Sequence, residues 1–446
     1  MSVRVFIYNL GCPKNQVDGE YIAGYLTESE NITLVDDYEV ADIIAVNTCG
    51  FIETAKEESI EAIFEAVKLK ETGNCQKVIV TGCLAQRYVD DIKSDIPEVD
   101  GIFGIGDYQK MVELVEEVKR GQRVTMVSEP EQGLNRDIPR VHKEKGTAYL
   151  KIADGCDQNC TYCTIPSIKG GFKSREMEYI LNEARRLVEQ GINELILVAQ
   201  DTALYGLDIY GEVRLAGLLE ELAKIDGLKW IRLMYTYPEH LEEKVLEVMA
   251  REDKICNYLD IPIQHAAGQV RKRMGRPGDR SSLEAKIARI RNVLPDVVLR
   301  TSLIVGFPGE SEEEFEELVD FIKEVKFDRL GVFTYSKEEN TPAARLDGQL
   351  DEDLKVRRYN QIMEEQQTIA LEKNSERVDK KLEIIVEEID GNRFNGRTEY
   401  DAPEIDNAIS GELPEEFEIE IGSIYLALVK SAFEYDLEGE IIDEIG

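Results

Sequence analysis

At residues 155–163 the chain reads Gly155-Cys156-Asp157-Gln158-Asn159-Cys160-Thr161-Tyr162-Cys163, directly after the apolar run 148–153. The run predicts a strand that delivers three cysteines, four and three residues apart, to one polar loop. Thiolates select zinc or iron–sulfur clusters. A zinc site would usually add a fourth Cys or His, but the next residues of those types along the chain are His240 and Cys256. Three thiolates suit a four-iron cluster with one iron left open for chemistry.

The spacing CxxxCxxC, with Tyr162 before the third cysteine, resembles the signature of radical S-adenosylmethionine (SAM) enzymes. The resemblance implies that Cys156, Cys160 and Cys163 hold a 4Fe-4S cluster whose open iron binds the amino and carboxylate groups of SAM. One electron from that cluster would cleave SAM to a 5′-deoxyadenosyl radical. A zinc knuckle and three incidental thiols remain the alternatives for the loop alone.

The composition narrows the class of protein. A chain of 446 residues predicts about two or three domains. It has no apolar run of the ~18 residues that a membrane span needs, and its start lacks a signal peptide's apolar core, so we expect a cytoplasmic protein with no membrane partner. Eight cysteines are too sparse for a disulfide scaffold. The net charge of -36 is opposite to that of a nucleic-acid binder, and it indicates either a basic partner or a solubility feature.

Residues 1–127 repeat one pattern of apolar strand, glycine turn and helix. The strands are expected at 3–9, 42–47 and 77–81, and the pattern predicts a doubly wound parallel sheet of the α/β class. Ligands bind such sheets at the carboxyl ends of the strands. One cysteine follows each predicted strand, so the three thiols should converge into a second site: Cys12, Cys49 and Cys83.

The sequence around these cysteines indicates a more specific family. The segments 11–15, 47–52 and 82–88 resemble the amino-terminal domain of the methylthiotransferases, and each contains one of the three cysteines. That resemblance implies an auxiliary 4Fe-4S cluster on Cys12, Cys49 and Cys83. Cys75 fits no such pattern, and we interpret it as structural.

A linker without periodicity is expected at 128–145, followed by a central domain at 146–374. Six strands alternating with helices predict a (β/α)6 partial TIM barrel, the fold that radical SAM enzymes resemble. After the strand at 148–153, the other five are expected at 194–199, 230–235, 258–263, 297–305 and 329–333. The helices between them are expected at 177–190, 215–225, 241–251, 282–293 and 311–325.

The carboxyl ends of these strands should touch SAM, because the Cys156 loop lies at the same edge. The candidate contacts are Tyr162, Gln200, Asp201, Gln264, Gly306 and Pro308. The segment Gly306-Phe307-Pro308-Gly309-Glu310 can also be explained as a turn followed by a helix N-cap at Ser311. His265 is well placed for a site, whereas His142 and His240 are interpreted as exposed or packing residues.

Residues 351–375 predict a charged connecting helix, and 375–446 predict a small β-barrel with strands at 382–387, 393–399, 417–421, 424–430 and 434–440. This barrel resembles the TRAM domain at the carboxyl end of methylthiotransferases, a module associated with RNA binding. Here it carries six Lys and Arg against twenty-one Asp and Glu, a net charge of -15. Such a surface would repel phosphate and attract a basic protein, which makes tRNA an unlikely partner.

Methylthiotransferases as a family modify either a tRNA adenosine or a protein side chain. The acidic barrel and the segment 205–210 favour the branch that modifies the β-carbon of an aspartate in the basic small-subunit ribosomal protein S-twelve. The resemblance implies that one cluster generates the radical, the auxiliary cluster presents sulfur, a second SAM supplies the methyl group and an external donor supplies electrons. A tRNA adenosine methylthiotransferase and a non-catalytic zinc or RNA-binding scaffold stay open as alternatives.

Overall fold

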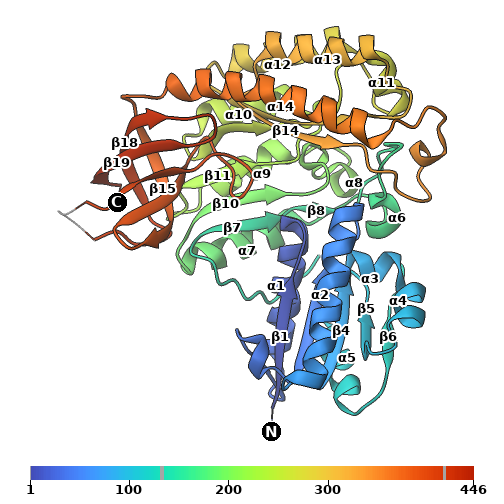
Figure 1. Cartoon of the computed structure of the whole chain (residues 1–446). Helices are drawn as coiled ribbons and strands as arrows, with labels where there is room; N and C mark the ends of the chain where they lie inside the picture. Colours follow the sequence, from blue (N-terminus) through green and yellow to red (C-terminus); the bar gives the residue numbers. More distant parts are fainter. Residues whose placement is uncertain (1, 131–134, 415–417, 446) are drawn as a thin grey trace. The chain divides into compact units, whose positions relative to one another are not determined.

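The computed structural model describes residues 2–130, 135–414 and 418–445, and the chain divides into two compact units (Figure 1). The first unit consists of residues 1–143, 151–158 and 163–183. The second unit consists of residues 144–150, 159–162 and 184–446. No helix in the described ranges is long and apolar enough to cross a membrane.

The first unit contains a six-stranded parallel sheet with the order β2-β1-β3-β4-β5-β6. The three predicted strands are confirmed, because each is an apolar run long enough to show in the sequence. The additional strands β2, β5 and β6 have only three residues each, which is too short for periodicity to reveal. The bounds are β1 Val3–Asn9, β2 Ile32–Leu34, β3 Ile43–Thr48, β4 Lys77–Gly82, β5 Gly101–Phe103 and β6 Val124–Met126.

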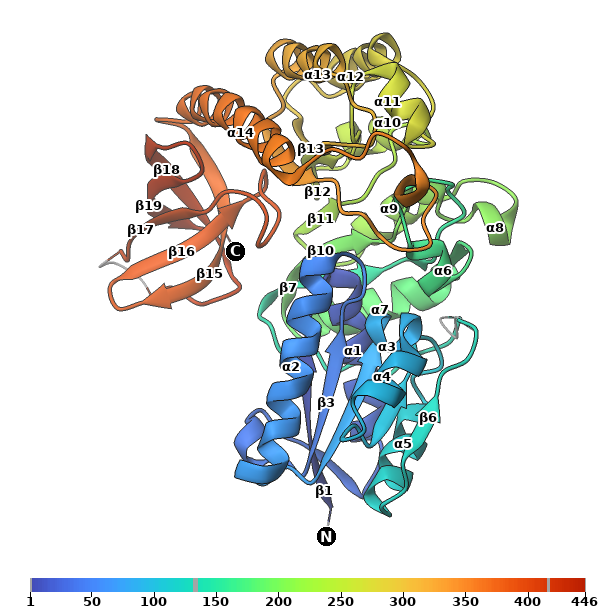
Figure 2. The same ribbon diagram turned by 45° about the vertical axis from the view of Figure 1, so that its right-hand side comes forward.

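Helices cover both faces of this sheet, with α2 on one face and α1 on the other (Figure 2). Beneath α2, the side chains of Ile63 and Ala66 pack with Val46 and Val80 of the sheet in one buried cluster. This doubly wound arrangement confirms the predicted fold class of this part of the chain. The helices are α1 Pro13–Thr27, α2 Glu53–Thr72, α3 Cys83–Arg87, α4 Val89–Asp95 and α5 Lys110–Lys119.

The second sheet has the order β14-β13-β12-β11-β10-β7, and the strands from β10 to β14 pair in parallel. Six strands alternating with helices confirm the predicted (β/α)6 partial barrel. The strands are β7 Gly146–Lys151, β10 Ile192–Val198, β11 Trp230–Leu233, β12 Ile255–Asp260, β13 Val298–Val305 and β14 Arg329–Thr334. The predicted helices are α7 Met177–Glu189, α9 Leu215–Ala223, α10 Glu243–Arg251, α12 Arg280–Val293 and α13 Glu312–Val325.

Three short helices in this part of the chain were not predicted, because four to six residues do not complete two helical turns. They are α6 Ile165–Lys169, α8 Leu207–Tyr210 and α11 Gly268–Arg273. A two-stranded pair, β8 Ala153–Asp154 with β9 Lys173–Ser174, brackets the cysteine loop and α6.

The helix α14 Glu352–Ser375 packs against β14 and leads into a closed barrel with the order β15-β16-β17-β19-β18. The predicted strand at 417–421 is wrong: Phe417 lies outside the described residues, and 418–421 form no strand. Their alternating apolar pattern ends in a turn at Gly422, where φ is +91°. The barrel strands are β15 Lys381–Asp390, β16 Arg393–Thr398, β17 Ile409–Glu412, β18 Ile424–Ala432 and β19 Leu437–Glu444.

The strand β17 was missed for a physical reason. Its central Gly411 lies so close to β19 that an added Cβ would fall 1.9 Å from the carbonyl oxygen of Gly439. The strand therefore needs a residue that normally weakens a strand prediction.

Within the second unit, buried ion pairs join the half-barrel sheet to the carboxyl-terminal barrel. Glu194 on β10 binds Arg232 from the neighbouring strand and Arg397 from the barrel, and all three side chains are at most 3% exposed. Burial alone would raise the pKa of Glu194, but the two guanidiniums outweigh it and lower the pKa to about 2. The pairs of this seam are Arg232–Glu194–Arg397, Arg300–Asp406 and Arg329–Asp401.

Candidate functional site

Three thiols lie at the carboxyl edge of the amino-terminal sheet, and we call Cys12, Cys49 and Cys83 the strand-end thiols. Cys12 precedes α1, Cys49 follows β3, and Cys83 is the first residue of α3 after β4. The turn before Cys12 lies close to Cys49, because a Cβ on Gly11 would lie 2.7 Å from the Cβ of Cys49. Gly11 also has φ of +89°, so this turn needs glycine for both its conformation and its space.

The strand-end thiols lie within electrostatic range of one another. Burial raises the pKa of Cys83 to about 12; the Lys169 ammonium opposes this rise, and Cys12 and Cys49 act in the same direction as burial. Burial likewise raises the pKa of Cys49, with Cys12 acting in the same direction. Without a metal these two buried groups are neutral thiols, and a bound metal would deprotonate them.

The donor set of the strand-end thiols fits an iron–sulfur cluster. Among the described residues, no group of three or more His, Cys, Asp or Glu side chains surrounds a position for a single metal ion. A four-iron cluster has a different requirement, because it binds each thiolate on a separate iron. Three separate soft donors at one sheet edge meet that requirement and leave the fourth iron without a protein ligand.

The cysteine loop after β8 is anchored on both sides. In the first unit, the backbone N–H of Cys156 donates to the carbonyl oxygen of Gly170 at 3.1 Å, and Gly155 takes φ of +74°. In the second unit, the N–H of Thr161 donates to the carbonyl oxygen of Met274 at 2.9 Å. All three cysteines of the loop are half-buried.

Tyr162 belongs to an aromatic group in the second unit. Its ring meets Phe307 edge to face at 6.3 Å, and its hydroxyl accepts a 3.5 Å hydrogen bond from Arg276. The Arg276 guanidinium also lies over the ring of Tyr237, 4.0 Å from its centre. Tyr162 is therefore packed against the loop that follows β13, and Arg276 is a residue of this edge that sequence reasoning missed.

Gln200 and Asp201 follow β10. Both carboxylate oxygens of Asp201 are engaged: Oδ1 accepts from the N–H groups of Ala203 and Tyr237 at 3.1 and 3.4 Å, and Oδ2 lies 2.6 Å from Nδ1 of His240. The His240 ring stacks on Tyr237 at 4.8 Å, as expected for a packing residue. Asp201 thus fixes the loops after β10 and β11, and the half-buried Gln200 stands next to it.

Two residues at the same edge have left-handed backbones although they are not glycine. Gln264 has φ of +72°, and Tyr235, which follows β11, has φ of +57°. Such conformations are costly and occur often at binding sites. The N–H of Gln264 donates to the carbonyl oxygen of Ser302 at 2.9 Å, which ties it to β13. Sequence reasoning missed Tyr235, because no local pattern signals its backbone conformation.

The segment after β13 brings Gly306 and Pro308 into the same edge, and both are buried. Gly306 has φ of +73°, and a Cβ there would lie 2.4 Å from Cγ of Lys355. Ser311 caps α13 in a capping box with Glu314, so the N-cap interpretation of this segment is confirmed. The capping box involves Ser311 and Glu314, while both backbone groups of Phe307 are bonded to Glu310.

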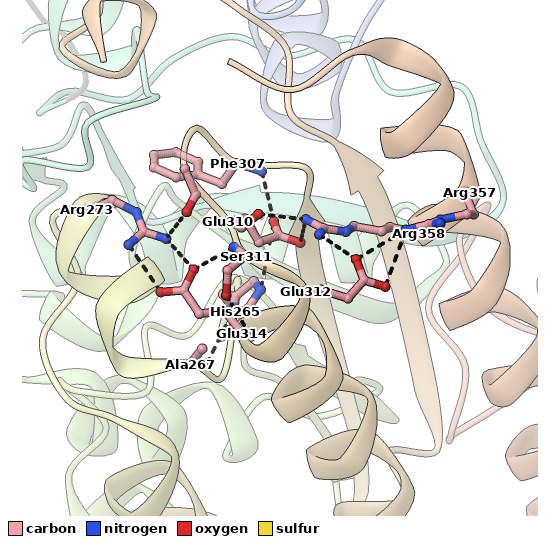
Figure 3. Close-up of polar contacts among 11 residues, drawn as sticks. His265, Ala267, Arg273, Phe307, Glu310, Ser311, Glu312, Glu314, Arg357 and Arg358 are labelled. Atoms are coloured by element: carbon pink, nitrogen blue, oxygen red, sulfur yellow. Dashed lines mark hydrogen bonds and ion pairs between the residues drawn. The ribbon is translucent and has the colours of Figure 1, made fainter. Parts of the chain in front are cut away.

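Behind this segment lies a buried polar group that Figure 3 displays. Oε2 of Glu310 accepts from the N–H of Phe307 at 2.9 Å, and Oε1 accepts from Arg358 at 2.8 Å. His265 is fully buried, and its Nδ1 accepts from the N–H of Ala267 at 3.0 Å. Sequence reasoning missed Glu310 and Arg358 as parts of this group, because they lie 48 residues apart.

Burial sets the protonation of this group. It raises the pKa of Glu310 to about 7 despite the neighbouring Arg358 guanidinium. It lowers the pKa of His265 to about 3, with Arg271 and Arg273 acting in the same direction. His265 is therefore neutral near pH 7, where the carboxyl of Glu310 changes its charge.

The remaining predicted residues are placed as follows. The side chain of His142 is buried, and its Nδ1 lies 3.1 Å from Oε1 of Glu20, so it is a packing residue. Cys75 lies in the core beneath α2, and its thiol donates to the carbonyl oxygen of Lys77 at 3.2 Å. That position agrees with a structural role.

Three families match this chain. Residues 150–322 match the Radical SAM superfamily, residues 4–104 match the Uncharacterized protein family UPF0004, and residues 378–442 match the TRAM domain.

Curated relatives match over almost the full length. The ribosomal protein uS12 methylthiotransferase RimO of Clostridioides difficile (strain 630) is 46% identical over 445 residues, which cover 99% of this chain and 100% of that protein. The protein of the same name from Desulforamulus reducens is 47% identical over 440 residues, covering 98% of each.

Solved structures share the fold. The radical S-adenosylmethionine methyltransferase TsrM from Kitasatospora setae, with cobalamin and a [4Fe-4S] cluster bound, has a TM-score of 0.57 at 17% identity and covers 77% of each chain. The cobalamin-dependent S-adenosylmethionine radical enzyme OxsB has a TM-score of 0.54 at 12% identity, covering 80% of this chain and 56% of that one.

Proposed function

This chain belongs to the RimO family of radical SAM methylthiotransferases, and from that membership we propose that it transfers a methylthio group to the β-carbon of an aspartate in ribosomal protein uS12. The observation that carries the proposal is the convergence of the strand-end thiols at one sheet edge. A radical SAM enzyme with only one cluster would not need this second thiol set. A sulfur-inserting enzyme would, because sulfur must be presented separately from the radical source.

We assign the metal ligands accordingly. Cys156, Cys160 and Cys163 would hold the radical-generating 4Fe-4S cluster, and the strand-end thiols would hold the auxiliary 4Fe-4S cluster. When bound, the clusters and SAM supply hydrogen abstraction, sulfur and the methyl group. An external donor would supply the electrons. We assign residues 1–127 to the auxiliary-cluster domain, 128–145 to a linker, 146–374 to the radical SAM domain and 375–446 to the TRAM-like barrel.

The half-barrel residues would hold SAM mainly through backbone and ring surfaces. Gly306 and Pro308 present a close, side-chain-poor backbone, and Gln264 turns its backbone at the same edge. Tyr162 contributes a ring packed on Phe307. We propose that Gln200 contacts SAM and that Asp201 contributes by fixing the loop, since both of its oxygens are already bonded.

Charge favours a basic protein as the substrate. The carboxyl-terminal barrel region 375–446 has a net charge of -15, and the whole chain has -36. A ribosomal protein that binds RNA offers the complementary charge, whereas tRNA would be repelled. We also propose that the reaction takes place in the cytoplasm. A tRNA substrate would instead require binding that weakens steeply with salt, which a gel shift at two salt concentrations measures.

The test compares two triple variants after anaerobic reconstitution. C156A/C160A/C163A should keep about half of the iron and lose SAM cleavage. C12A/C49A/C83A should also keep about half of the iron but retain SAM cleavage, and it should add no methylthio group to uS12 by mass spectrometry. C75A is the matched control, and it should keep both clusters and full product. Unchanged SAM cleavage in the first variant would refute the assignment.

A further inference from the structure

A buried charge cluster lies next to the strand-end thiols in the first unit. We use that name for Asp18, Lys151, Asp154 and Lys169, whose side chains are at most 5% exposed. Nζ of Lys169 donates to Oδ2 of Asp18 at 2.7 Å and to Oδ2 of Asp154 at 3.3 Å. Lys151 binds the same two carboxylates. The two cations and two anions have no net charge together. The electrostatic potential at a neighbouring group therefore depends on which of the four side chains lies closest to it.

Of this buried charge cluster, Lys169 has the strongest electrostatic effect on the Cys83 thiol. It ends α6, a helix that contacts α3, and the preceding Ile168 packs against Cys83 in a small buried cluster. Among the neighbouring charged groups, Lys169 has the largest effect on the pKa of Cys83, and it favours the thiolate. Asp18 acts on the same thiol in the opposite direction and more weakly. Lys169, on α6, is therefore the main cation that acts on Cys83.

The same short segment also contacts the cysteine loop. The carbonyl oxygen of Gly170, the residue after Lys169, accepts the hydrogen bond from the N–H of Cys156. A Cβ on Gly155 would lie 2.1 Å from the carbonyl oxygen of Gly171. α6 and the two glycines after it thus connect a strand-end thiol with the first cysteine of the loop.

A fixed cation beside a cluster ligand has a predictable effect. A 4Fe-4S cluster gains one negative charge on reduction, and its potential depends on nearby charge and on burial. In a buried site the attraction is weakly screened, so an ammonium stabilises the reduced state. Lys169 is held as an ammonium by two carboxylates.

We propose that Lys169 raises the reduction potential of the auxiliary cluster and so makes that cluster easier to reduce. This inference rests on the proposed function, which supplies the auxiliary cluster. Lys169 would act through the electric field at Cys83 and would touch neither SAM nor the substrate. The alternative is that Lys169 only neutralises Asp18 and Asp154.

The experiment isolates the auxiliary cluster in the C156A/C160A/C163A background and measures its midpoint potential by redox titration with electron paramagnetic resonance. Adding K169M should lower the reduced-to-oxidised ratio at a fixed potential at least tenfold, which equals 59 mV for one electron. K169R keeps the charge and should restore the parent potential. K173M removes an exposed lysine four residues further on and should leave the potential unchanged.

A second variant tests the opposite sign. D18N removes a carboxylate that binds both lysines, so it should raise the potential. If K169M binds no iron, D18N decides alone, and a potential that does not rise overturns the inference. Equal potentials in K169M and the parent, at equal iron content, overturn it as well. A background protein that binds no iron would overturn the proposed function together with this inference.

Discussion

The two parallel sheets differ in what they present at their carboxyl edges. The amino-terminal sheet presents the three strand-end thiols, which approach one another across tight glycine turns. The half-barrel presents polar side chains that are bonded to each other, such as Asp201 with His240 and Glu310 with Arg358. The first edge therefore offers side chains to a ligand, whereas the second offers mainly backbone and aromatic rings.

This difference shows that position at a strand end does not by itself define a contact residue. At the first edge the cysteine thiols form no ion pair or hydrogen bond with another side chain among the described residues that would hold a loop in place, so their position and their chemistry agree. At the second edge the carboxylates and arginines hold the loops in place, and Gln264 and Tyr235 have left-handed backbones. A strand-end residue is a ligand candidate only after its own hydrogen bonds have been considered.

The largest effect should appear in the chemistry of the apo thiols. Because burial raises the pKa of Cys83 from 9.0 to about 12, its thiolate fraction falls roughly a thousandfold, and its alkylation should slow by a similar factor. Peptide mass spectrometry of metal-free protein after timed iodoacetamide treatment at pH 8 measures the rate. The half-buried Cys12, Cys156, Cys160 and Cys163 should react first. Alkylation of Cys83 at the rate of glutathione would contradict the described burial.

The next effect concerns stability in the reconstituted protein. The strand-end thiols lie 37 and 34 residues apart, whereas the loop thiols lie four and three apart. By the chain-entropy relation for cross-links, each long closure contributes about 4 kcal/mol and each short one about 2 kcal/mol. C12A/C49A/C83A should therefore lower the Tm more than C156A/C160A/C163A does. The metal-free forms of both variants serve as controls. Equal decreases of the Tm in the two reconstituted variants would contradict this prediction.

The smallest effect is a pH dependence of stability that comes from Glu310 at the carboxyl edge of the half-barrel. The pKa of Glu310 is about 7 in the folded state and ordinary in the unfolded state, so its contribution is complete below about pH 4.5. That contribution, on the order of 3 kcal/mol, is lost as the pH rises through 7. The Tm of E310Q should therefore fall less than that of the parent between pH 5 and 8. E312Q, which changes a half-exposed neighbour, should follow the parent. Parallel profiles for E310Q and the parent would contradict the assignment.

Much of the fold could be predicted from the sequence, because long apolar runs with glycine turns mark strands such as β1, β3 and β4. The three-residue strands β2, β5 and β6 and the short helices α6, α8 and α11 could not be predicted, since too few positions repeat. The convergence of the strand-end thiols followed from the regularity of a parallel sheet. The partners of Lys169 could not be found this way: Asp18 lies 151 residues away, and only the folded chain brings them together.

The seam of ion pairs between the half-barrel sheet and the carboxyl-terminal barrel limits how the protein can be dissected. Arg329 takes its carboxylate, Asp401, from the barrel, and Arg300 takes one of its two carboxylates there. Removal of residues 375–446 would leave the buried Arg329 without Asp401 and Arg300 with Asp260 alone, and a buried cation that loses its partner is costly. Deletion mutants would thus confuse loss of substrate recognition with loss of folding. Surface charge reversals on the intact barrel are the cleaner way to ask what it recognises.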